Sequence, residues 1–157
     1  MDQRDKAFVP HVLPITVGTG VVFENSDSIA HHVYSFSPPR RFDFYLSEGE
    51  SREVVFQSPG VVALGCNVHD WMLAYVVVLE TPYFTMTGTD GRAILGDLPP
   101  GDYRLQLWHP RIDRKERGIR RDLRIEAVGQ ETWRVTLERP LLPDRTGERA
   151  PEYGGAE

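Results

Sequence analysis

A chain of 157 residues, 40% hydrophobic and 26% charged, is long enough for one ordinary domain or two small ones with a packed core. The formal net charge of −5 at pH 7 argues against nucleic acid as the main partner. Because the sequence has no apolar run of about 18 residues or more, it predicts no membrane span.

Residues 1–80 consist of short apolar runs separated by turn signals, and helix signals are scarce. The chain contains 12 prolines and 14 glycines, and many of them stand between these runs. This pattern is typical of an all-β sandwich or barrel. The expected strands are residues 12–17, 21–24, 32–36, 42–46, 53–56, 61–64 and 72–79.

A second series of short runs begins near residue 81. Its expected strands are residues 83–87, 93–95, 103–108, 123–127 and 132–137. After Pro140 the chain becomes polar, rich in proline and glycine, and loses periodicity. We therefore expect one domain at residues 1–80, a smaller β-sandwich at residues 81–140 and a flexible tail at residues 141–157.

Cys66 is the only cysteine of the chain, which excludes an internal disulfide and any zinc site built from several thiolates. Three roles stay open: an inert core thiol, a catalytic nucleophile or a metal ligand. No nucleophile-elbow or oxyanion motif surrounds Cys66, so a cysteine hydrolase is disfavoured.

The segment GCNVHDWM brings three potential ligands close together between two apolar runs. Cys66, His69 and Met72 stand three residues apart, and thiolate, imidazole and thioether are soft or borderline ligands. Two histidines and a cysteine, with a weak axial methionine, form the blue-copper type of site. The missing histidine is His31 or His32, since adjacent strand residues point to opposite faces.

Each of these residues also has a simpler interpretation. A lone buried cysteine is usually a small hydrophobe, and a methionine at a strand start is usually part of the core. Asp70 could orient a ligand, although a solvated loop carboxylate is the simpler assignment. Trp71 is either a packing residue or a contact surface.

In combination, the motifs of residues 1–80 resemble the cupredoxins of the plastocyanin and amicyanin type. Ala30-His31-His32-Val33 resembles the family's Pro-His-Asn-Val, in which the histidine binds copper. The segment from Phe56 to Met72 resembles the closing half of the family, with the short amicyanin-type gaps around His69. The phrases HHVYSFSP, GCNVHDWM, TPYF and LWHPR resemble proteins labelled methylamine utilisation protein.

The resemblance implies a Greek-key cupredoxin β-sandwich at residues 1–80 with one copper ion in a type 1 site. Its ligands would be His31, Cys66, His69 and Met72, and His32 would take asparagine's place and brace the loop after the ligand strand. The implied role is one-electron transfer between redox partner proteins in the periplasm, without enzymatic activity. The polar start MDQRDKAF lacks a signal peptide, so an exported protein would have lost that segment.

Two alternatives come from other functional classes. The protein could be a copper carrier or storage module, or a non-redox interaction module with a vestigial site. Residues 81–140 resemble a carboxypeptidase-regulatory-like β-sandwich, through TDGR at residues 89–92 and LPPGDY at residues 98–103. Modules of that kind usually bind or brace.

Overall fold

The computed structural model describes residues 1–112, 119–127, 129–144 and 146. In these residues the expected all-β class is confirmed: the regular elements are strands, and no helix is long and apolar enough to cross a membrane. The chain divides into two units, of which the first contains Met1–Pro82 and the second is Tyr83–Asp144. Most of the expected flexible tail, residues 145 and 147–157, lies outside the described residues.

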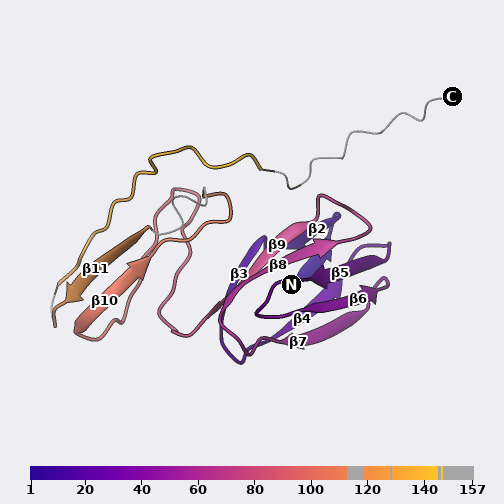
Figure 1. Cartoon of the computed structure of the whole chain (residues 1–157), viewed down its shortest axis with the longest axis horizontal. Coiled ribbons are helices and arrows are strands. Elements are labelled where there is room, and N and C mark those ends of the chain that lie inside the picture. The colour runs from indigo at the N-terminus through magenta and orange to yellow at the C-terminus, as the bar shows by residue number, and fades with distance from the viewer. Residues whose placement is uncertain (113–118, 128, 145, 147–157) are drawn as a thin grey trace. The chain divides into compact units, whose positions relative to one another are not determined.

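The first unit is built from two mixed β-sheets (Figure 1). One sheet has the strand order β2(Ala7–Val9), β1(Asp2–Arg4), β4(Gly20–Asn25) and β7(Ser51–Val55). The other has the order β3(Val12–Thr16), β9(Leu73–Leu79), β8(Gly60–Cys66), β5(His31–Ser35) and β6(Phe42–Leu46). β1 pairs with β4 and β3 with β9 in parallel, whereas the other pairs are antiparallel.

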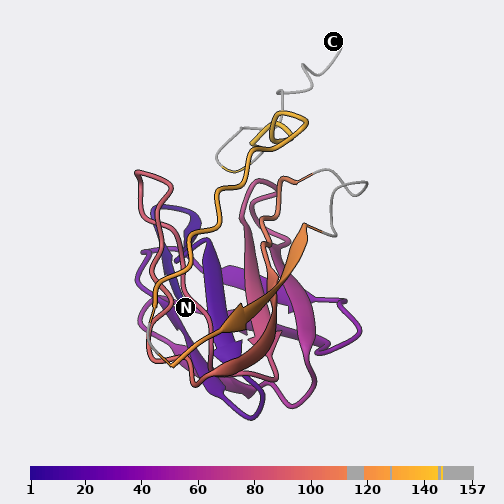
Figure 2. The ribbon, with the colours of Figure 1, turned by 90° about the vertical axis from the view of Figure 1, so that its left-hand side faces the viewer.

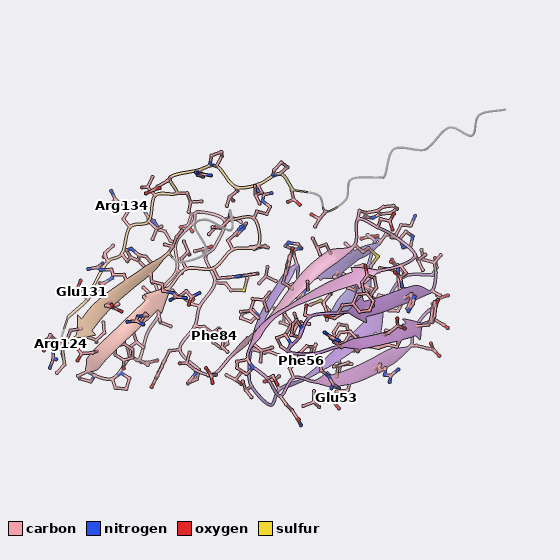
Figure 3. All side chains as sticks on the ribbon, viewed as in Figure 1. Glu53, Phe56, Phe84, Arg124, Glu131 and Arg134 are labelled. Atoms are coloured by element: carbon pink, nitrogen blue, oxygen red, sulfur yellow. The ribbon has the colours of Figure 1, made fainter. Side chains whose placement is uncertain are left out.

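The two sheets pack face to face because their strands alternate between buried and exposed residues. Phe23 of β4 is fully buried, and its ring centroid lies 5.5 Å from that of Phe42 and 5.8 Å from that of Phe44, both in the opposite sheet. Phe56 is also fully buried, while Glu53 of β7 is exposed; Figure 3 labels both residues. The first unit is therefore a β-sandwich with one shared core.

All seven strands expected before residue 80 are confirmed, as β3 to β9. β1 and β2 were not expected, because they are three residues long and their sequences, DQR and AFV, lack a clear apolar alternation. They pair through a tight turn in which Asp5 and Lys6 both have positive φ angles, 55° and 58°.

The second unit differs from the expected sandwich. Its described residues form one two-stranded sheet, in which β10(Gly101–Gln106) pairs with β11(Arg120–Ile125) (Figure 2). The strands expected at residues 83–87, 93–95 and 132–137 are wrong, since these residues have no strand structure. Strand propensity stabilises a strand only when its side chains pack against neighbours, and the Ile94 side chain is 83% exposed.

The sandwich core gives a stability prediction. Phe23→Ala should lower the free energy of unfolding by about 3–5 kcal/mol, because it removes a fully buried aromatic ring at the contact between the sheets. Val22→Thr is the matched control: Val22 is the preceding residue of β4, is 43% exposed and should change stability by less than about 0.5 kcal/mol. Urea unfolding followed by circular dichroism measures both. Equal effects would contradict the packing described above.

Candidate metal centre

Two neighbouring strands of the five-stranded sheet place a histidine and the cysteine in the core. His31 begins β5 and Cys66 ends β8, and the two strands pair in antiparallel register with Val33 opposite Cys66. Since alternate residues of β5 face inward, His31 shares its face with Val33, and both are fully buried. Cys66 is 3% exposed.

His69, in the loop between β8 and β9, completes a cluster with these two residues. The potential ligand atoms of His31, Cys66 and His69 all lie within 4.8 Å of one another. Nδ1 of His31 is 3.6 Å from Sγ of Cys66, and the two imidazole centroids are 5.1 Å apart. A thiolate and two imidazoles at these separations can hold one soft or borderline metal ion.

The environment of His69 fits a metal ligand. Its side chain is nearly buried, and within the described residues its Nδ1 atom has no hydrogen-bond partner. Burial lowers the pKa of His69, and electrostatic interaction with His31 and Lys6 lowers it further, while Asp27 acts in the opposite direction. The neutral imidazole that these effects favour has a free lone pair, which is the form that binds metals. A bound ion would therefore satisfy a buried nitrogen that has no partner in the protein.

Asp27 orients the ring of His31. Its Oδ2 atom is 2.8 Å from Nε2 of His31. Burial raises the pKa of Asp27, but hydrogen bonds from the Lys6 N–H, the His31 ring and the Asp5 N–H outweigh burial and leave this pKa below its usual value. Because an ionised carboxylate can only accept, Nε2 of His31 carries a proton, and in the neutral ring Nδ1 presents its lone pair toward Cys66.

His32 lies on the other face of the sheet, away from this cluster. Its Nε2–H donates to Oδ1 of Asp43 at 2.7 Å, and Nδ2 of Asn67 donates to its Nδ1 at 2.9 Å. The His32 ring also stacks on Tyr45, with centroids 4.0 Å apart. The contact with Asn67 is the brace to the loop after β8 that the resemblance implied for His32.

Met72 is buried next to the loop that carries His69. It directly precedes β9, is 2% exposed and belongs to the core cluster, and its N–H donates to the carbonyl oxygen of His69 at 3.0 Å. The structure brings the ligand atoms of His31, Cys66 and His69 within 4.8 Å of one another. For Met72 it shows a buried side chain on a tight turn that begins at His69.

Sequence reasoning missed the carboxylate that contacts a candidate ligand. Asp70, which was considered for that role, is exposed to solvent. Asp27 stands in the turn cluster Asn25-Ser26-Asp27-Ser28, four residues before His31, and this spacing is the only signal that the sequence offers. Its partners come from a turn more than twenty residues away, which the apolar pattern does not reveal.

The chain matches no protein-family model and no curated protein. Among solved structures it is similar to a Cu-containing nitrite reductase (NirK) from Thermus scotoductus SA-01, at 28% identity and a TM-score of 0.48 over 51% of this chain and 22% of that one. It is similar to a purple cupredoxin from Nitrosopumilus maritimus at 33% identity, with a TM-score of 0.41 over 45% of this chain and 79% of that one. A reduced amicyanin variant is 20% identical, with a TM-score of 0.47 over 50% of this chain and 78% of that one. The chain thus spans less than a quarter of the nitrite reductase.

Proposed function

We propose that the first unit is a cupredoxin that binds one copper ion and transfers single electrons between partner proteins. The observation that carries this proposal is the buried cluster of His31, Cys66 and His69, whose ligand atoms lie within 4.8 Å of one another. In the proposal these residues are the strong ligands, and Met72 is a weak axial ligand.

The donor set favours copper over the other common metals. A structural zinc site normally has four strong ligands, and the single cysteine excludes the sites with several thiolates. One thiolate with two imidazoles and a thioether is the arrangement typical of blue copper. Calcium and magnesium prefer oxygen ligands, which this cluster lacks.

The surroundings of the cluster favour electron transfer over metal delivery. Copper, when bound, supplies the one-electron chemistry, and the protein's part is to hold the ligands still and to keep water away. His31 and Cys66 belong to paired strands and are 0% and 3% exposed, so they have little freedom to rearrange. A copper carrier needs ligands that a partner can reach, and only His69 approaches the surface here. The periplasmic location and the redox partners belong to the same proposal and are supported by the sequence resemblance.

The proposal predicts a coloured protein. Loading with Cu(II) should give one equivalent of bound copper and an intense thiolate-to-copper band in the visible spectrum. Cys66→Ser should abolish the band while circular dichroism shows that the fold is kept. Tight binding of one copper ion by a colourless wild-type protein would favour the carrier, and failure to bind copper would favour a vestigial site.

The two adjacent histidines should respond differently to replacement. His31→Ala should abolish the visible band, because it removes an imidazole whose Nδ1 lies 3.6 Å from Sγ of Cys66. His32→Ala should keep the band, because His32 contacts Asp43 and Asn67 on the other face of the sheet. Absorption spectra of the copper-loaded variants decide between them. If His32→Ala loses the band and His31→Ala keeps it, the copper ligand is His32 and not His31.

Met72 provides a test of the axial position. Met72→Gln should lower the reduction potential while copper stays bound, because an amide oxygen is a harder donor than a thioether and favours Cu(II). Met86→Gln is the control, since Met86 is 53% exposed and belongs to the second unit. Cyclic voltammetry measures both variants. An unchanged reduction potential in Met72→Gln would mean that Met72 is a core residue and not an axial ligand.

A further inference from the structure

We propose that Asp27 is a positioning residue that couples His31 to the turn between β1 and β2, so that this N-terminal turn forms an outer part of the metal centre. The coupling to a metal rests on the proposed function, whereas the positioning of the His31 ring can be tested without metal.

Three donors converge on the carboxylate of Asp27. Its Oδ1 atom accepts the N–H of Asp5 at 2.7 Å, and its Oδ2 atom accepts the N–H of Lys6 at 2.9 Å and Nε2–H of His31 at 2.8 Å. Both oxygens are thus used, and one side chain joins the turn directly to the candidate ligand. When one ring nitrogen of a histidine is the metal ligand, a carboxylate that accepts the N–H of the other nitrogen fixes both the tautomer and the orientation of that ring.

The N-terminal turn is shaped to make these contacts. Asp5 and Lys6 both adopt the left-handed conformation, with φ angles of 55° and 58°. Successive N–H groups in a tight turn of this kind can point to one side and form a concave site for an anion. The β1–β2 ladder closes the turn, with Arg4 opposite Ala7. The turn therefore presents two N–H groups to Asp27.

Asp27 is also held through its backbone. The side chain of Asn25 is 2% exposed, and its Oδ1 atom accepts the N–H of Asp27 at 3.0 Å. Nδ2 of Asn25 donates to the carbonyl oxygens of Ile29 and Leu46, at 2.8 Å and 3.0 Å. Through these bonds, Asn25 attaches the loop that contains Asp27 to β6. The carboxylate is therefore held both by its own backbone and by its three donors.

The arrangement makes the coupling reciprocal. A metal ion on Nδ1 of His31 would make Nε2–H a stronger donor to Asp27, and a firmly held Asp27 would in turn keep Nδ1 aimed at the ion. Two consequences follow for this chain. Loss of the Asp27 carboxylate should weaken metal binding, and metal binding should protect the N–H groups of Asp5 and Lys6 from exchange with solvent.

The chain offers a matched control for the loss of this carboxylate. Asp43 binds Nε2 of His32 at 2.7 Å, as Asp27 binds Nε2 of His31 at 2.8 Å, but on the face of the sheet away from the cluster. Asp27→Asn and Asp43→Asn therefore each remove one carboxylate charge from an aspartate–histidine pair, and the two histidines are adjacent in the sequence. Only the first removal should affect the candidate centre.

The first measurement uses the full chain without metal. Imidazole 15N chemical shifts should show His31 as a single tautomer protonated at Nε2 in the wild type. In Asp27→Asn the amide can donate as well as accept, so this single tautomer should be lost, whereas Asp43→Asn should leave His31 unchanged. An unchanged His31 tautomer in Asp27→Asn would overturn the positioning role.

The second measurement uses Cu(I), which is diamagnetic. Asp27→Asn should bind Cu(I) about 10–100-fold more weakly than the wild type, and Asp43→Asn should stay within about threefold. In the wild type, Cu(I) should slow the exchange of the Asp5 and Lys6 N–H groups about fivefold or more. Equal losses of affinity in both variants, or unchanged exchange, would overturn the coupling. A wild type that binds no copper but keeps the tautomer that Asp27→Asn loses would overturn the proposed function and support the positioning role.

Discussion

The register between β5 and β8 is the constraint on which the candidate centre depends. Val33 lies opposite Cys66, so the inward-facing residues of β5 meet the end of β8 inside the core. Because side chains alternate along a strand, a slip of one residue would turn His31 outward and bring His32 to the inside. The apolar residues that share the inward face therefore decide which histidine reaches Cys66, and the rest of the centre is built around that pair.

A cluster of polar side chains in a sandwich core needs partners, and the structure supplies most of them. Asp27 satisfies one nitrogen of His31, and the N-terminal turn and Asn25 in turn hold Asp27. Nδ1 of His69 has no partner among the described residues, and an unsatisfied buried group costs about 1–3 kcal/mol. A metal ion that accepts this lone pair would remove that cost, so a position that is unfavourable for folding without the ion is well prepared to bind one.

The sequence predicts the strands with large apolar side chains and misses those fixed by long-range contacts. The strands β3 to β9 follow from apolar runs and turn residues, but β1 and β2 depend on a turn with two left-handed residues and on pairing with β4. In the second unit, propensity without a packing partner led to strands that do not form, as the exposure of Ile94 shows. At the centre, spacing identified Cys66 and His69, and the resemblance to cupredoxins selected His31. Neither of them identified Asp27 as a partner of His31, because that role depends on Asp5 and Lys6 folding back beside it.

X-ray absorption at the copper K edge, recorded on the copper-loaded protein in both oxidation states, tests the central claim most directly. The arrangement of His31, Cys66 and His69 on paired strands predicts one thiolate sulfur and two imidazole nitrogens bound to copper in Cu(II) and in Cu(I) alike. A copper site without a sulfur ligand, or one that loses an imidazole on reduction, would contradict a rigid centre built for electron transfer.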